Sequence, residues 1–303
     1  MKKTVIVLCV ILAVGFILAV VGTCIYLSSE EKAMGKYEKV EKTIEADGLN
    51  LLTVDSQVED ITIAKTDGEN FTLTYYEGKR LEHTVDNSTE GKLTLYTKRQ
   101  MQFFNLWMIN RYAAYRAITV GIPQNYTGAL ILKTDTGRIK ADGLKNLSGV
   151  ETDVKTGDTK LSGITAHTLK VNSATGNVTI ENCEFSSGVT VNSSTGNVSV
   201  NGAKAEEVTV KLTTGKVSVN ADCKTLSLTA TTGDINFSTV TACDVFVKAT
   251  TGSISGTIRG AEEDYDIRCD TTTGDCNLTD RIKECGKKLV ASATTGDIKI
   301  KFI

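Results

Sequence analysis

The sequence predicts an all-β protein built as a β-solenoid, with one transmembrane helix before it at the amino terminus. Three observations support this prediction: a Thr-Gly pair recurs about every 20 residues, apolar and polar residues alternate on both sides of each pair, and the chain opens with a long uncharged apolar run. A single proline, two histidines and many Gly, Thr, Ser, Asn and Val residues also favour strands and tight turns over helices.

Composition and charge are those of an ordinary folded chain. Hydrophobic residues make up 41% of the 303 residues and charged residues 23%, so disorder is not expected. Lys plus Arg is 34 and Asp plus Glu is 36, which gives a net charge of −2. Nothing in this balance attracts nucleic acid, and we expect no nucleic-acid partner.

The first element is the apolar run over residues 4–27, which contains no charged residue and is long enough to cross a bilayer as a helix. Two lysines precede it and two glutamates follow. The positive-inside rule therefore places residues 1–3 in the cytoplasm and everything after about residue 28 outside the cell, with residues 28–36 as a spacer.

This run has two alternative interpretations, a cleaved signal peptide and a lipoprotein signal. A cleaved signal peptide is disfavoured, because the run exceeds a normal signal-peptide core and no small-x-small site follows it. The stretch Val21 to Cys24 resembles a lipoprotein processing box, but Thr23 before the cysteine fits that box poorly. A lipidated Cys24 would leave the same topology.

Residues 37–130 alternate less regularly and are expected to form the first, irregular coils of the solenoid and its membrane-proximal cap, since a solenoid exposes its core at each end. The predicted strands are Leu49–Asp55, Asp60–Lys65, Phe71–Tyr76, Lys92–Thr97, Ile118–Ile122 and Ala129–Lys133.

Residues 131–303 carry the regular repeat, whose turn glycines lie 18 to 22 residues apart. They are Gly137, Gly157, Gly176, Gly196, Gly215, Gly233, Gly252, Gly274 and Gly296. A tight corner needs a residue that accepts positive φ, and the Asp or Asn that often follows is a common turn residue. Each repeat thus predicts two strands and one solenoid coil, and nine coils at about 4.8 Å each would give a rod roughly 40 Å long.

The chain ends inside a predicted strand from Ile298 to Ile303. We expect this strand to form the far end of the rod and to be poorly capped. The flanking Lys299 and Lys301 would then discourage pairing along the open edge.

The stretch Ile118 to Pro123, followed by a strand and then by Thr-Gly turns to the end of the chain, resembles the bacterial putative-adhesin family over about residues 37–303. The single-pass anchor is similar to members found beside envelope-stress regulators in Gram-positive bacteria. The resemblance implies a β-solenoid placed outside the cytoplasm, and it brings no catalytic residues with it.

Six cysteines lie outside the apolar run, and four of them are candidates for disulfides. Cys223 and Cys243 sit at corners between repeats, where coil stacking can bring them together. Cys269 and Cys276 flank the turn at Gly274 at inward-facing columns. Buried free thiols are the competing interpretation, and the lack of a Cys-x-x-Cys pair argues against a metal site.

The segment Met101 to Tyr112 is the one aromatic-rich stretch, and it interrupts the β alternation. The simpler interpretation is that it plugs the open end of the solenoid. The sharper hypothesis is that Phe103, Phe104, Trp107 and Met108 contact the bilayer interface or a membrane partner.

An enzyme is not expected, because His83 and His167 are isolated in sequence and no nucleophile elbow, zinc-protease helix or phosphate loop is present. The nine-residue glycine-aspartate repeat of calcium β-rolls is also missing, so the Asp and Asn residues beside the glycines are assigned to turn chemistry, and we expect no metal and no cofactor.

The sequence therefore predicts a membrane-anchored, extracytoplasmic, adhesin-like binding or scaffold protein of the cell envelope. Its expected partners are wall polymer, a surface ligand or a neighbouring membrane protein. The first alternative is an accessory protein of an envelope-stress sensing system that binds a membrane partner. The second is a carbohydrate-active β-helix enzyme, which would need a cluster of acidic residues that the regular coils lack.

Overall fold

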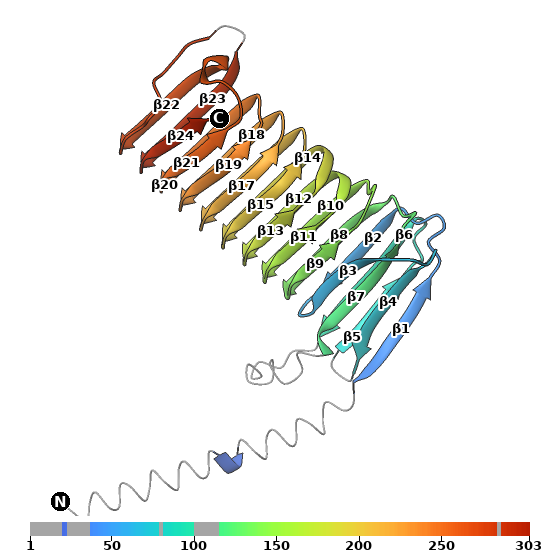
Figure 1. The fold of residues 1–303 in the computed structure, drawn as a ribbon. Coiled ribbons are helices and arrows are strands. Elements are labelled where there is room, and N and C mark those ends of the chain that lie inside the picture. Colours follow the sequence, from blue (N-terminus) through green and yellow to red (C-terminus); the bar gives the residue numbers. More distant parts are fainter. Residues whose placement is uncertain (1–19, 23–36, 79–80, 100–114, 284–285) are drawn as a thin grey trace, which may run out of the picture.

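A computed structural model describes residues 20–22, 37–78, 81–99, 115–283 and 286–303. Almost all of the described chain is β-structure, arranged as a stack of strands that runs the length of a rod (Figure 1). The all-β and solenoid predictions are confirmed. Within the described residues, no helix has the length and apolar character needed to cross a membrane. The predicted span over residues 4–27 lies outside them apart from Val20, Val21 and Gly22.

The strands form two ladders, which correspond to the two strands of each predicted repeat. The first ladder contains, in spatial order, β5 (Leu81–Asp86), β6 (Lys92–Arg99), β2 (Leu51–Ser56), β8 (Ala129–Thr136), β10 (Gly149–Thr156), β12 (Thr165–Thr175), β14 (Glu184–Thr195), β16 (Glu207–Thr214), β18 (Thr225–Thr232), β20 (Asp244–Thr251), β23 (Lys287–Thr295) and β22 (Tyr265–Thr273).

The second ladder contains β1 (Glu38–Ile44), β4 (Phe71–Glu77), β7 (Ala117–Pro123), β3 (Asp60–Thr66), β9 (Ile139–Asp142), β11 (Thr159–Ser162), β13 (Val178–Glu181), β15 (Val198–Lys204), β17 (Val217–Asp222), β19 (Ile235–Val240), β21 (Ile254–Ile258) and β24 (Ile298–Phe302). Pairing is parallel except for β1 with β4, β4 with β7 and β5 with β6.

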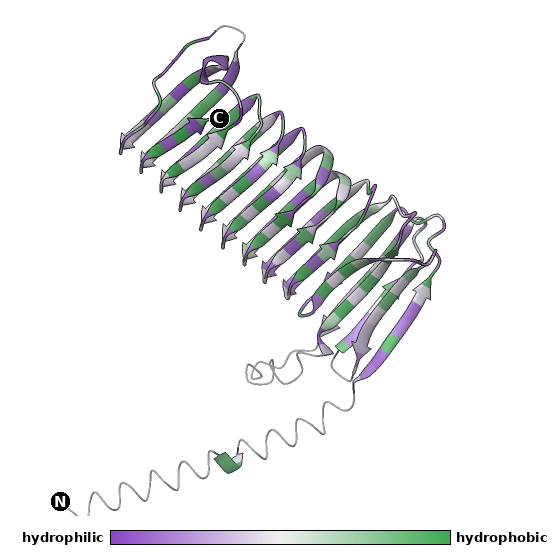
Figure 2. Ribbon diagram, viewed as in Figure 1, coloured by the Kyte–Doolittle hydropathy of each residue, from purple (hydrophilic) through white to green (hydrophobic). Residues whose placement is uncertain are grey.

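The core lies between the two ladders and is built from columns of aliphatic residues. Val189, Val208, Leu226 and Val245 are successive partners in the first ladder, and each is at most 1% exposed. The residues between them along each strand face outward, so hydrophobic and hydrophilic positions alternate in the coloured ribbon (Figure 2). This alternation is the period-2 pattern that the sequence shows.

Chain order and spatial order differ at both ends of the rod. At the amino-terminal end, β2 and β3 form a coil that lies between β6 and β8 in one ladder and between β7 and β9 in the other. At the other end, the last coil of the chain, β23 and β24, is inserted next to β20 and β21, and β22 lies beyond it. β24 is still the last strand of its own ladder, so Ile298–Ile303 does lie at the far end, but residues 276 and 277 bind its outer edge and the expectation that it is poorly capped is wrong.

All six strands predicted over residues 49–133 are present, shifted by at most three residues at their ends. Two strands were not predicted, β1 and β5. Both are edge strands whose outward positions carry charges, and each pairs antiparallel with a single described neighbour. Such charged edges discourage pairing with another chain, and the same charges weaken the sequence signal for a strand.

Candidate functional site

The turn glycines form a continuous column along the rod. Gly233 has φ +133°, and a Cβ added to it would lie 1.8 Å from the carbonyl oxygen of Gly215 in the preceding coil. The same contact recurs from coil to coil through Gly252. Glycine is therefore required at these positions for two reasons: the backbone has a positive φ, and consecutive turns lie too close together to leave room for a side chain.

Gly137 is the exception in this column. Its φ is not in the left-handed range, and what excludes a side chain there is the Glu59 carbonyl oxygen, 2.2 Å from the added Cβ. The positive-φ argument made from the sequence does not apply to this residue, although the steric argument does.

Where an Asp or Asn follows a turn glycine, its side chain can bind the backbone of the neighbouring coil. Asp158 accepts a hydrogen bond from the backbone N–H of Asn177 at 2.8 Å, and Asn177 in turn accepts one from the N–H of Asn197 at 3.0 Å. Asp234 accepts likewise from Ser253 at 2.8 Å. These oxygens serve the turns, and the described part of the chain holds no group of three His, Cys, Asp or Glu residues placed to bind a metal.

A shallow groove runs along the outward face of the first ladder and crosses the strands of five coils. We call it the outer groove, and its volume is about 490 Å³. Its outward-facing side chains are mostly small or uncharged: Asp153, Lys155, Asn172, Ala174, Asn192, Ser194, Lys211, Thr213, Thr229 and Thr231. Asn192 donates its amide to the Asn172 side chain at 3.2 Å, which extends the coil stacking to the surface.

The outer groove presents hydrogen-bonding groups at regular intervals, because equivalent positions of successive strands lie about 4.8 Å apart. The Lys211 ammonium makes no ion pair or hydrogen bond among the described residues, whereas that of Lys155 pairs with Asp135 at 2.6 Å. Such a surface can contact a long hydrophilic chain lying across the strands.

One coil departs from the tight Thr-Gly turn. β6 pairs with β2 and β7 pairs with β3, so β6 and β7 belong to the same coil. Residues 100–116 connect these two strands, whereas the corresponding connection between β8 and β9 has only two residues. This insertion contains Phe103, Phe104, Trp107 and Met108, all of which lie outside the described residues.

The described end of the insertion is fastened to the neighbouring turn. The Arg116 guanidinium donates to the Val58 carbonyl from Nε at 3.0 Å and from Nη2 at 2.7 Å. Tyr115 stacks on Tyr37 with ring centroids 4.9 Å apart and meets Tyr76 edge-on at 5.3 Å. The last residues of the insertion, Tyr115 and Arg116, therefore lead into β7, and Tyr115 lies beside Tyr37, the first residue after the predicted spacer.

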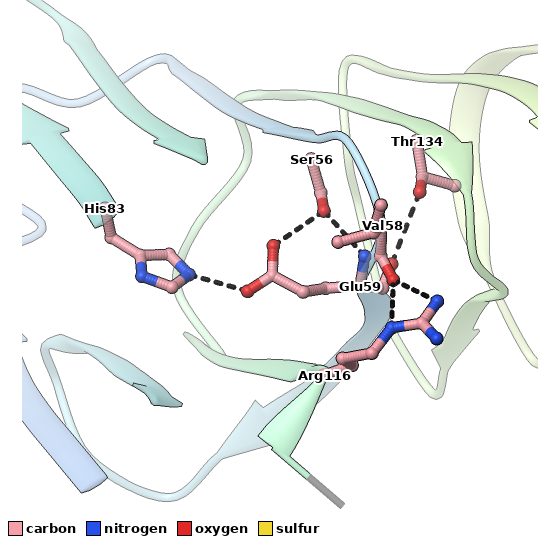
Figure 3. Close-up of polar contacts among 6 residues, drawn as sticks. All are labelled: Ser56, Val58, Glu59, His83, Arg116 and Thr134. Atoms are coloured by element: carbon pink, nitrogen blue, oxygen red, sulfur yellow. Dashed lines mark hydrogen bonds and ion pairs between the residues drawn. The ribbon is translucent and has the colours of Figure 1, made fainter. Parts of the chain in front are cut away.

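A buried polar cluster lies under this turn (Figure 3). His83 Nε2 is 2.7 Å from Glu59 Oε1, and neither side chain is exposed to solvent. Ser56 donates its hydroxyl to Glu59 Oε2 at 2.8 Å and accepts the Glu59 N–H at 2.9 Å. The Thr134 hydroxyl donates to the Glu59 carbonyl at 3.3 Å. His83 is therefore not isolated, and the sequence reasoning missed its partner because 24 residues separate the two.

Three buried polar atoms beside this pair lack a hydrogen-bond partner: Tyr75 OH, His83 Nδ1 and Thr97 Oγ1. The Tyr75 ring lies 4.3 Å from the His83 ring, and Thr97 is the cross-strand partner of His83. The Glu59 and His83 side chains are closed to solvent, so the pair supports the structure of this end of the rod.

The four candidate cysteines divide into two pairs. Cys269 and Cys276 form a disulfide with a Cα–Cα distance of 6.6 Å. Cys223 and Cys243 are free, so the candidate disulfide between them is not present in the structure. Cys223 packs against the core whereas Cys243 is exposed, and burial raises the pKa of the Cys223 thiol to about 12. A thiol of this kind is a poor nucleophile at neutral pH.

The fold and the turn column define a β-solenoid protein with regular Thr-Gly coils. The chain belongs to the Toastrack DUF4097 family, whose profile matches residues 49–301. This assignment confirms the resemblance to the bacterial putative-adhesin family.

Among solved structures, the chain is similar to a "putative adhesin" from Bacteroides fragilis at 14% identity and a TM-score of 0.43, covering 88% of this chain and 97% of that one. A "putative adhesin" from Parabacteroides distasonis has 13% identity and a TM-score of 0.43, covering 89% and 98%. A "putative lipid binding protein" from the same species has 14% identity and a TM-score of 0.35, covering 89% and 97%. No curated protein matches the chain.

Proposed function

We propose that this chain is a membrane-anchored binding or scaffold protein of the cell envelope, that its solenoid lies outside the cytoplasm, and that it catalyses no reaction. The outer groove is the observation that carries the proposal. In it, outward side chains from five successive coils line a common depression.

The chemistry of the outer groove favours a hydroxyl-rich polymer such as a wall glycan. Amide and hydroxyl groups from Asn172, Asn192, Ser194 and Thr213 can donate to and accept from sugar hydroxyls. A polymer lying along the rod meets an equivalent set of groups at each coil, so many weak contacts add together. Because the groove carries few charges, it gives little attraction to polyanions such as nucleic acid.

Two features support the proposed location. The apolar run over residues 4–27 with lysines before it provides an anchor of the right length and orientation. The Cys269–Cys276 disulfide fits an oxidising compartment, where such bonds persist.

A groove-filling substitution tests the proposed binding surface. Ser194→Trp places a bulky ring in the outer groove, and we expect the amount of full-length protein that pellets with purified insoluble peptidoglycan to fall at least fivefold. Ser199→Trp is the matched control, because Ser199 faces outward from the same coil on the second ladder. Equal pelleting of both variants and the unaltered protein would count against the outer groove.

A second candidate function rests on the insertion between β6 and β7. Its replacement of one tight turn, and the fastening of its end by Arg116, favour a role in contacting a neighbouring membrane protein as part of envelope-stress sensing. Phe103, Phe104, Trp107 and Met108 are the proposed contact residues.

In-cell crosslinking followed by mass spectrometry tests this alternative. A specific membrane protein recovered with the unaltered chain should be lost with Trp107→Ala and retained with Phe246→Ala. Phe246 is the matched control because it is an exposed aromatic residue on the regular coils, 39% accessible to solvent. Recovery that is unaffected by Trp107→Ala would assign the insertion to capping.

A further inference from the structure

The end of the rod farthest from β1 is closed by residues 276–283, which we call the distal cap. Its backbone and side chains occupy the outer edges of the last strands, β22 and β24. We infer that the distal cap covers a latent dimerisation edge, that β22 is the strand which pairs, and that the partner is a second copy of this chain.

The distal cap imitates the hydrogen bonds of a neighbouring strand. Ile267 and Arg281 exchange both backbone hydrogen bonds, at 2.8 and 2.9 Å, and the Cys269 N–H donates to Asp280 Oδ1 at 2.8 Å. On β24, the Asn277 side chain pairs with both backbone groups of Ile300, each at 2.8 Å. Edge groups left open would otherwise accept a strand from another molecule.

The distal cap is fastened at several points. The Cys269–Cys276 disulfide joins its first residue to β22. The Arg281 guanidinium donates to the Glu262 carbonyl at 3.0 Å and pairs with the Glu262 carboxylate at 3.3 Å, and Lys283 donates to the Glu263 carbonyl at 2.6 Å. Reduction by a dithiol, which itself becomes a disulfide, would yield two thiols and remove the covalent fastening.

The charges on β22 fit a second copy of the same strand. Asp266, Arg268 and Asp270 alternate along it with Ile267 and Cys269, whose backbone groups bind the distal cap. Antiparallel pairing of β22 with its copy about Cys269 places Arg268 of each molecule opposite Asp270 of the other. Opposite charges at cross-strand positions stabilise such a pair, and a two-fold axis uses the same patch on both molecules.

Sedimentation equilibrium of the full-length chain in density-matched detergent tests this inference. The unaltered, oxidised chain should be monomeric. A variant without the fastenings, Cys269→Ser/Cys276→Ser/Asn277→Ala/Asp280→Ala/Arg281→Ala/Lys283→Ala, should double its mass at micromolar concentration and retain slow hydrogen exchange at the amides of residues 267 and 269. Treatment of the unaltered chain with dithiothreitol removes the disulfide alone, and it should also shift the chain toward the dimer, which gives a second test if this variant does not fold. A monomer with fast exchange at these amides in both preparations would overturn the inference.

A charge exchange tests the register. Adding Arg268→Glu to the variant without fastenings should weaken dimerisation at least tenfold, and adding Asp270→Arg as well should restore it. The matched control is Lys248→Glu, which reverses an exposed charge on β20, a strand that is paired on both edges and so offers no edge to a partner. A dimer that is insensitive to Arg268→Glu, or equally sensitive to Lys248→Glu, would overturn the assignment of β22 as the paired edge.

Discussion

At the scale of single residues, the turn glycines combine two requirements that substitutions can separate. Gly233 and Gly260 have nearly the same φ, +133° and +130°. An added Cβ at Gly233 meets a backbone oxygen at 1.8 Å, whereas at Gly260 it meets only the end of the Lys287 side chain at 3.9 Å. The two sites therefore distinguish backbone strain from steric exclusion.

We expect Gly260→Ala to lower the free energy of unfolding by about 1–3 kcal/mol, the usual cost of a non-glycine residue in this conformation. Gly233→Ala should cost clearly more, because the carbonyl of Gly215 must also move. Urea denaturation of both variants measures the difference. Equal losses would show that adjacent turns can separate freely, contrary to the close column in the structure.

Asp55 gives the molecule a pH dependence at the residue scale. Burial, the largest cause, raises the pKa of its carboxyl group above 3.8; Lys133 opposes this shift and Asp135 adds to it. The folded state therefore binds the proton more tightly than the unfolded state does. The contribution to stability is present in full below pH 3.8 and is lost as pH rises through the raised folded-state pKa.

Asp55→Asn should consequently raise the melting temperature at pH 7, where the unaltered carboxylate is charged and partly buried. Below pH 3.8 the difference should shrink, because both side chains are then neutral. Melting curves from pH 3 to 7 measure it, and a variant that is less stable at pH 7 would mean that attraction to Lys133 outweighs burial.

At the scale of elements, the Glu59–His83 pair joins the β5 edge to the first turn. Removing one partner of a buried pair leaves the other uncompensated, which costs about 3–5 kcal/mol. We expect Glu59→Gln and His83→Gln each to destabilise the fold by this order. The double variant should lose less than the sum of the two, and the coupling energy from a double-mutant cycle checks this. Strictly additive losses would show that the two side chains act independently.

Neighbouring regular coils make the same three kinds of contact throughout: aliphatic side chains stack in the core, the turn glycines pack against each other, and Asp or Asn side chains beside the glycines bind the next turn. Each coil therefore contacts mainly its two neighbours, as in other solenoids. The coil of β6 and β7 keeps both strand pairings and replaces only the turn, which explains how a long insertion is tolerated there.

At the scale of the whole molecule, this nearest-neighbour arrangement predicts a gradient of local stability. Interior amides exchange only after several coils open, whereas amides near an end need fewer. We expect slow hydrogen exchange over β12–β18 and faster exchange over β1 and β5. Exchange measured by mass spectrometry on the full-length chain checks this, and uniform protection from end to end would contradict it.

Much of this molecule could be read from local sequence. The period of the Thr-Gly pairs and the alternation beside them predict the coils, the inward columns and the turn glycines, because both signals arise within about 20 residues. The assignment of the Asp and Asn residues to turn chemistry agrees with their hydrogen bonds to neighbouring coils.

The tertiary structure alone decided what depends on distant pairing. It placed β23 between β20 and β22, joined His83 to Glu59, left Cys223 and Cys243 unpaired and gathered the outer groove from five coils. Periodicity specifies that a strand has a neighbour but not which strand it is, since every coil offers the same backbone groups and similar apolar columns. The order of the coils at the two ends therefore follows from the packing of the whole chain.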